Sequence, residues 1–113
     1  MGDKMLNIAS EFWKYPAGRS KIDGPYNGET FRINHLAPKL REVIQAGGKL
    51  TVSMDGLLSC GSSFLDSAFG GLVRDDKFTK KELENHLRIV VTMKELERYR
   101  TAALQHIERA LPS

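Results

Sequence analysis

Residues 52–72 read VSMDGLLSCGSSFLDSAFGGL, and the fold can be predicted by working outward from this stretch. It continues an alternation that starts at Leu50, in which every second residue is apolar, as in a strand with one buried face. A short loop segment that begins and ends in glycine, 56–61, comes next. Apolar residues then recur from Phe64 to Val73 at intervals of one, three and four, the spacing of an amphipathic helix. A strand, a loop and a helix in this order indicate an α/β unit.

The rest of the chain repeats this alternation. Strands are predicted at 4–12, 49–55 and 87–92, and long helices at 28–46, 62–73 and 93–111. Strands that alternate with helices are joined by right-handed crossovers and lie in one sheet. One core suffices for a chain of this length, so we expect one domain over residues 1–113. Its fold class is α/β, with a mixed or mostly parallel sheet and helices packed on it. The side chains expected to be nearly inaccessible to solvent are Val52, Phe64, Leu65, Phe69 and Ile89.

Four local signals fix where helices begin and end. Asn27 is a candidate N-cap for the first long helix, and Gly47-Gly48 ends it. Thr79–Glu82 has the pattern of a capping box and predicts a short helix before the third strand. Thr92–Glu95 has the same pattern and predicts the start of the last helix.

Residues that disfavour regular structure occur at three places. Pro38 lies inside the first helix and should kink it or remove a hydrogen bond. Gly70-Gly71 weakens the second helix by about 1 kcal/mol per glycine relative to alanine, for which close packing against a neighbour is the usual compensation. The segment 14–28 is rich in glycine and proline and predicts a loop, with a short second strand near Ser20–Ile22.

Composition excludes several classes of protein. The chain is 41% hydrophobic and 27% charged with a net charge of +3, which is ordinary globular composition and makes nucleic acid an unlikely partner. Apolar runs are far too short to span a membrane, and we see no signal peptide. The single cysteine, Cys60, then favours the cytoplasm. No metal-ligand spacing, cofactor motif or catalytic constellation is present, so we expect no enzyme.

A serine pair opens the second long helix. The first N–H groups of a helix have no partner within it, and the helix dipole favours negative charge there. Two interpretations remain open. Ser63 can simply cap the helix, with Asp66 three residues further on, or a hydroxyl at this position can be a regulated phosphorylation site.

The loop before the first helix carries candidate anion-binding residues: Arg19, Lys21, Arg32 and Gly28. Glycine allows close approach of a ligand to the backbone, and a helix N-terminus attracts anions. We expect Arg19 and Arg32 to point toward each other or toward a common anion or acidic side chain. Local ion pairs with Asp23 or Glu29 are the structural alternative. Three aromatic residues flank the loop and are expected to pack around it: Trp13, Tyr15 and Tyr26.

Several motifs in order resemble those of a STAS-like domain family of unknown function, related to the STAS domains of anti-sigma-factor antagonists. They are Gly18-Arg19, Asp23-Gly24-Pro25, Gly28-Glu29-Thr30-Phe31-Arg32 and Ser63-Phe64-Leu65-Asp66-Ser67-Ala68-Phe69-Gly70-Gly71. Against the STAS pattern, Ser62 occupies the phosphoacceptor position. Gly61 and Ser53 stand where that pattern has acidic residues. Asp66-Ser67 is an alternative match, one turn inside the helix.

This resemblance implies a non-enzymatic regulatory module that binds a protein partner and switches partners when a serine is phosphorylated. The partner it implies is a GHKL-type ATP-binding kinase or an anti-sigma factor. Its contact edge would contain Ser62, Ser63, Asp66 and Ser67. The alternative function is binding of a phosphorylated small molecule or nucleic acid through Arg19, Lys21, Arg32 and Gly28.

Overall fold

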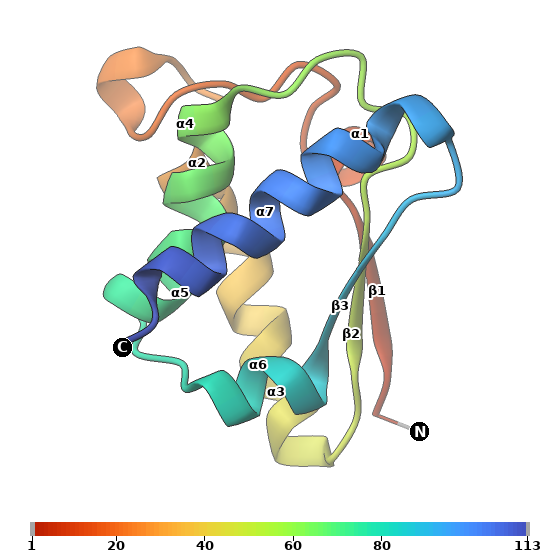
Figure 1. Cartoon of the computed structure of the whole chain (residues 1–113), viewed down its shortest axis with the longest axis vertical. Coiled ribbons are helices and arrows are strands. Elements are labelled where there is room, and N and C mark those ends of the chain that lie inside the picture. The colour runs from red at the N-terminus through yellow and green to blue at the C-terminus, as the bar shows by residue number, and fades with distance from the viewer. Residues whose placement is uncertain (1, 113) are drawn as a thin grey trace.

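A computed structural model describes residues 2–112 of the chain. Three short strands, β1 (Lys4–Asn7), β2 (Leu50–Ser53) and β3 (Leu87–Val90), form a parallel sheet in the order β1-β2-β3 (Figure 1). Their register aligns Leu6, Val52 and Ile89 in one row, and all three side chains are buried. The predicted α/β class is confirmed. The sheet is parallel at both of its strand pairs.

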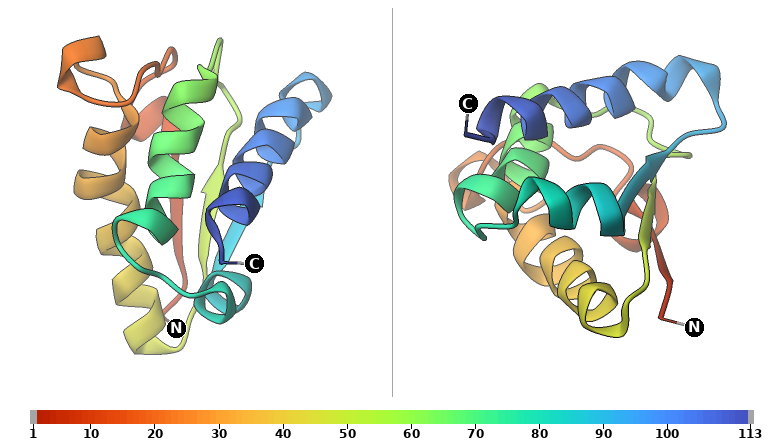
Figure 2. Two further views of the ribbon diagram at one scale, coloured as in Figure 1. Left: turned by 60° about the vertical axis from the view of Figure 1, so that its left-hand side comes forward. Right: turned by 60° about the horizontal axis from the view of Figure 1, so that its bottom comes forward.

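The helices gather on one face of this sheet (Figures 1 and 2). One long helix consists of α2 (Gly28–Phe31), the π-helical segment η2 (Arg32–Leu36) and α3 (Ala37–Ala46). A second consists of α4 (Ser62–Leu65), the π-helical segment η3 (Asp66–Gly70) and α5 (Gly71–Arg74). The short α6 (Lys80–His86) precedes β3, and α7 (Glu97–Ala110) follows it. All five side chains predicted for the core are buried.

Pro38 is accommodated by a widened turn. The N–H of Ala37 donates to the carbonyl of Arg32, five residues earlier, where an α-helix would use a carbonyl four residues earlier. Pro38 then lies in the first turn of α3. The helix therefore continues past the proline at the cost of regular hydrogen bonding. It ends as predicted at Gly47, which takes the left-handed conformation with φ +73°.

One predicted strand is too long and another is wrong, both for local reasons. The strand expected at 4–12 ends at Asn7, because the Asn7 side chain accepts a 2.8 Å hydrogen bond from the Ser10 N–H and caps the helical turn α1 (Ile8–Glu11). The short strand near Ser20–Ile22 is instead a 3₁₀ turn, η1 (Lys21–Asp23). Asp23 accepts a 2.9 Å hydrogen bond from the Arg19 N–H there, which folds the loop back on itself.

The capping box predicted at Thr79 is confirmed, but the one at Thr92 is wrong. The Thr92 hydroxyl donates to Asp55 Oδ2 at 2.8 Å, and its N–H donates to Asp55 Oδ1 at 2.9 Å. Thr92 therefore ties the chain after β3 to the chain after β2. The helical structure begins two residues later, as the 3₁₀ turn η4 (Lys94–Leu96), which leads into α7.

The two long helices cross where each carries glycine. A Cβ on Gly28 would lie 2.6 Å from the carbonyl oxygen of Phe64, and a Cβ on Gly71 would lie 2.6 Å from Nε of Arg32. Both distances are shorter than any normal contact, so each glycine makes room for the opposite helix. The close packing expected around Gly70-Gly71 is therefore present, with the Arg32 side chain lying against Gly71.

Candidate functional site

The loop between β2 and α4 is fastened at several points. The Asp55 carboxylate accepts hydrogen bonds from Thr92, and these bonds lower the pKa of Asp55. The bond from the Thr92 N–H has the largest effect. Further along, the N–H of Leu58 donates to Lys14 O and the N–H of Gly61 donates to Pro16 O. The loop thus lies beside residues 14–16, and these bonds fix the position at which α4 begins.

Ser62 is the first residue of α4, and it is exposed, as is Ser63. The expectation that Ser63 caps the helix is wrong. Gly61 is the N-cap, and its carbonyl accepts the first helical hydrogen bond, from the Leu65 N–H at 3.1 Å. Among residues 2–112, neither serine hydroxyl has a hydrogen-bond partner within the chain. We call this exposed first turn, with Ser62 and Ser63, the Ser62 edge.

Asp66 and Ser67 have structural contacts instead. Arg19 Nη1 donates to Asp66 Oδ2 at 2.6 Å and Arg74 Nη1 donates to Asp66 Oδ1 at 3.0 Å. The Ser67 hydroxyl donates to the carbonyl of Arg19 at 2.9 Å. These two residues therefore fasten the 14–28 loop to the second long helix, and neither presents a free group at the Ser62 edge.

His106 of α7 completes the environment of Asp66, with its Nδ1 3.3 Å from Asp66 Oδ1. Burial alone would raise the pKa of Asp66, but the bonds from Arg19 and Arg74, with the charges of Arg74 and His106, bring it below its usual value. Burial lowers the pKa of His106. The charge of Asp66 acts in the opposite direction, and the charges of nearby arginines lower the pKa further. Asp66 is therefore ionised at neutral pH, and it joins the loop, α5 and α7.

The four candidate anion-binding residues do not form one open cluster. Arg19 pairs with Asp66, whereas Arg32 Nη1 donates to Asp76 Oδ2 at 2.8 Å, so the expectation of a common acid is wrong. The Arg32 side chain is only 6% exposed, and Gly28 is buried. Lys21 is exposed and has no ion pair within the described chain. Both arginines are paired with aspartates that lie far away in the sequence, and no local spacing reveals such pairs.

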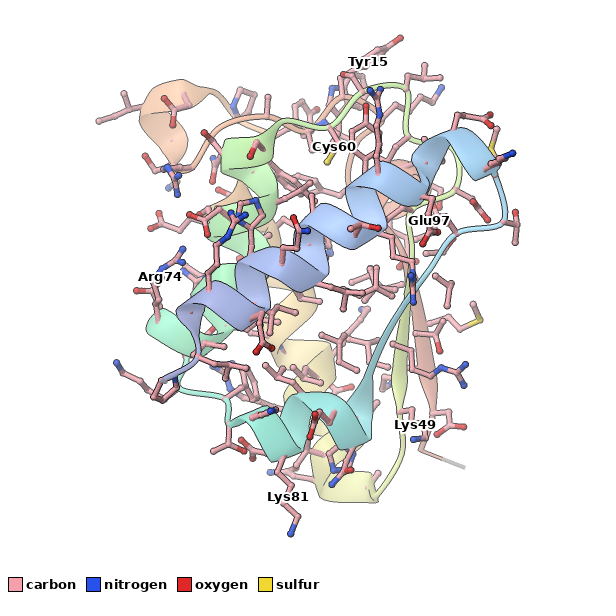
Figure 3. All side chains as sticks on the ribbon, in the orientation of Figure 1. Tyr15, Lys49, Cys60, Arg74, Lys81 and Glu97 are labelled. Atoms are coloured by element: carbon pink, nitrogen blue, oxygen red, sulfur yellow. The ribbon has the colours of Figure 1, made fainter. Side chains whose placement is uncertain are left out.

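Aromatic side chains gather next to the Ser62 edge. The Trp13 and Tyr26 rings stack with centroids 4.7 Å apart, and Tyr15 lies against Trp13 at 6.0 Å. These rings pack together as expected, yet each stays exposed, and Leu58 beside them is 61% exposed. Figure 3 shows Tyr15 and Cys60 at the end of the molecule where α4 begins. We call Trp13, Tyr15, Tyr26 and Leu58 the aromatic patch.

Neither metal binding nor thiol chemistry is indicated in the part of the chain that the structure describes. Burial raises the pKa of the Cys60 thiol to about 12, so almost no nucleophilic thiolate forms at neutral pH. Residues 2–112 contain no cluster of three or more histidine, cysteine or acidic side chains that could hold a metal ion. In that range no helix is both long and apolar enough to cross a bilayer.

Comparison with known proteins shows which family the chain resembles. The profile of a family described as a STAS-like domain of unknown function matches residues 27–95, which include the Ser62 edge and the contacts of Arg32. Searches of curated proteins and of solved structures gave no match. The motifs of residues 28–32 and 63–71 thus fall within the matched range, and they form the helix crossing described above.

Proposed function

Because the chain belongs to the STAS-like domain family, whose domains are generally non-catalytic, we propose that it is a regulatory protein-binding module switched by phosphorylation of Ser62. The single observation that carries the proposal is the Ser62 hydroxyl, which is exposed, has no hydrogen-bond partner among residues 2–112 and stands at the position that matches the STAS phosphoacceptor. By the same resemblance, the partner is a GHKL-type ATP-binding kinase or an anti-sigma factor.

The surroundings of Ser62 support a switch by charge. A phosphate there carries about two negative charges, and the free N–H groups of the first helical turn favour it. The adjacent aromatic patch supplies apolar contact area, and Lys14 and Lys21 add positive charge to the neighbouring loop. An acidic partner is attracted to this surface and is repelled once Ser62 is phosphorylated.

We predict that Ser62→Ala retains partner binding and that Ser62→Asp weakens it at least about tenfold, which corresponds to roughly 1.4 kcal/mol. Each variant is immobilised and exposed to lysate of its own organism, and the retained proteins are quantified by mass spectrometry. Melting temperatures are recorded separately. Because Ser62 makes no hydrogen bond with another described residue, both variants should unfold like the wild type, within about 0.5 kcal/mol.

Ser63→Asp is the matched control, since it adds the same charge to the next position of the same helical turn. We expect it to weaken binding much less than Ser62→Asp. Equal retention of every protein by Ser62→Ala and Ser62→Asp, or an equal loss with Ser63→Asp, would show that Ser62 is not the switch.

A further inference from the structure

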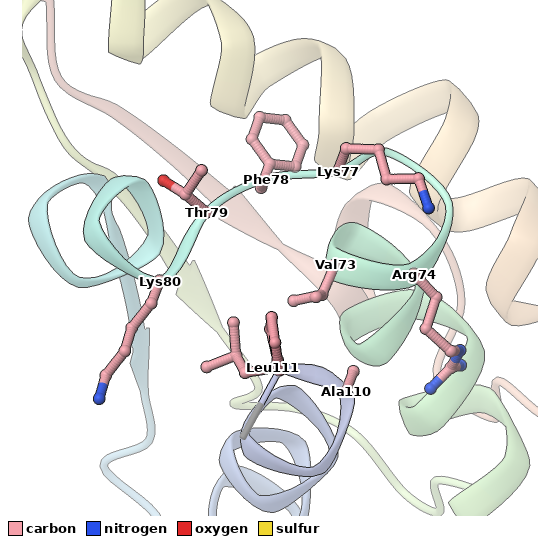
Figure 4. A pocket seen from close by; sticks show the side chains of 9 residues that line it. Val73, Arg74, Lys77, Phe78, Thr79, Lys80, Ala110 and Leu111 are labelled. Atoms are coloured by element: carbon pink, nitrogen blue, oxygen red, sulfur yellow. The ribbon is translucent and has the colours of Figure 1, made fainter.

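A pocket lies at the opposite end of the second long helix from Ser62. It is an open pocket, lined by residues at the end of α5, in the turn 77–79, at the start of α6 and at the end of α7 (Figure 4). Its volume is about 540 Å³, within the range of roughly 300–1,000 Å³ that is typical of small-molecule sites. Neither the Ser62 edge nor the aromatic patch contributes to it, so its role is independent of the proposed switch.

The walls are apolar and the rim is positively charged. Val73, Ala110 and Leu111 are among the apolar lining residues, and Figure 4 shows Val73 and Leu111 facing its centre. The rim carries three cations, Arg74, Lys77 and Lys80, and no carboxylate side chain of residues 2–112 lines the pocket. An interior of this kind favours a ligand that combines an apolar body with a negative charge.

Two of these cations are available to a ligand. Arg74 is engaged with Asp66 through its Nη1 and with the Asp66 carbonyl through its Nη2, each at 3.0 Å. Lys77 and Lys80 are exposed, and neither has an ion pair with another residue in the range 2–112. In Figure 4 their side chains extend away from each other, so both must rotate toward the opening to contact one anionic group there.

The backbone at Lys77 adds a second observation. Its φ of +64° is the only left-handed value of a non-glycine residue among the described residues. A lysine in this conformation costs energy that glycine or asparagine largely avoids. This conformation belongs to the end of α5, where the Phe78 N–H donates to the Leu72 carbonyl at 3.0 Å, and the lysine places a positive charge at the rim there.

From this combination we propose that the pocket binds a small amphipathic carboxylate. Its apolar chain lies against Val73, Ala110 and Leu111, and its carboxylate is held by Lys77 and Lys80 once their side chains turn toward the opening. A small ligand fits better than an extended peptide, because helix ends and a turn form the walls and no strand edge offers backbone hydrogen bonds.

The test uses decanoate, titrated into the ¹⁵N-labelled chain and followed by amide chemical shifts. Decyltrimethylammonium, with the same apolar chain and the opposite charge, is the ligand control. We expect saturable shifts with decanoate, centred on the residues that line the pocket, and none there with the cation. Decanoate shifts centred elsewhere, or equal binding of both compounds, would overturn the proposal.

The double variant Lys77→Asn/Lys80→Gln removes both charges, and asparagine tolerates the left-handed turn. Lys81→Gln/Lys94→Gln removes two exposed lysines outside the pocket and is the matched control; Figure 3 shows Lys81 extending away from the molecule. We expect about tenfold weaker decanoate binding for the first variant and less than about a twofold change for the second. The first variant should melt no lower than the wild type. An equal loss of affinity in both variants would overturn the assignment.

Discussion

Replacing Arg32 with methionine is expected to destabilise the protein by about 3 kcal/mol, because it leaves the carboxylate of Asp76 mostly buried without its closest cation. The Arg32 and Asp76 side chains are only 6% and 14% exposed, and Nη1 donates to Oδ2 at 2.8 Å. Methionine matches the length of the arginine stem, so the loss reports the charge and its hydrogen bond. Urea unfolding followed by circular dichroism measures it.

Arg41→Met is the control, since Arg41 approaches the same Asp76 from the solvent side. Its side chain is 55% exposed and its Nη2 lies 3.4 Å from Asp76 Oδ1. We expect a loss below about 1 kcal/mol, as for surface ion pairs. Asp76→Asn, added to Arg32→Met, should restore part of the lost stability. Similar losses for Arg32→Met and Arg41→Met would contradict a buried pair.

Gly28→Ala is expected to destabilise the protein by roughly 3 kcal/mol, at the upper end of overpacking effects. The added Cβ would lie 2.6 Å from the Phe64 carbonyl oxygen and 2.9 Å from the Ala68 backbone nitrogen. Since both atoms are backbone, the two long helices must move apart to admit the methyl group. Thermal unfolding should show a markedly lower melting temperature.

Gly70→Ala provides the comparison for this steric argument. Its Cβ would meet Arg74 Nη1 at 2.7 Å and Asp66 Oδ1 at 2.8 Å, which are the ends of side chains that can shift. Alanine also favours the helix by about 1 kcal/mol over glycine, so we expect little net change. A melting temperature of Gly28→Ala no lower than that of Gly70→Ala would show that the helices do not cross this closely.

The helices and strands could be predicted from local patterns, because hydrophobic periodicity and helix caps depend on residues only a few positions apart. The alternation at Leu50–Met54, the Asn27 cap and the capping box at Thr79 all reappear in the structure. Asn7 was missed although its cap is local, because the alternation of Leu6 and Ile8 suggested that the strand continued.

Long-range polar partners could not be predicted in the same way. Thr92 has the sequence pattern of a cap, yet its hydroxyl binds Asp55, which lies 37 residues away. Arg32 has a local acidic neighbour in Glu29 but pairs with Asp76, 44 residues away. One signal was available: a buried arginine needs space, and Gly71 in the middle of a helix provides it.

The candidate site was predicted in part. The sequence predicted that Ser62 lies between strand and helix, and the structure confirms that it is exposed. The sequence also favoured Ser62 over Asp66-Ser67, because that pair lies one turn inside the helix. The contacts with Arg19, which the sequence did not reveal, show that Asp66 and Ser67 fasten the loop. The exposure of the aromatic patch depends on how two loops meet, and only the fold reveals it.

The most direct test of a switch at Ser62 is the phosphate occupancy of this residue in the native protein. The protein is isolated from its own cells and separated by size-exclusion chromatography into partner-bound and free fractions. Peptide mass spectrometry then measures occupancy in each fraction. We predict that Ser62 carries phosphate in the free fraction and is unmodified in the bound fraction. Equal occupancy in both fractions, or phosphate confined to other serines, would contradict the account.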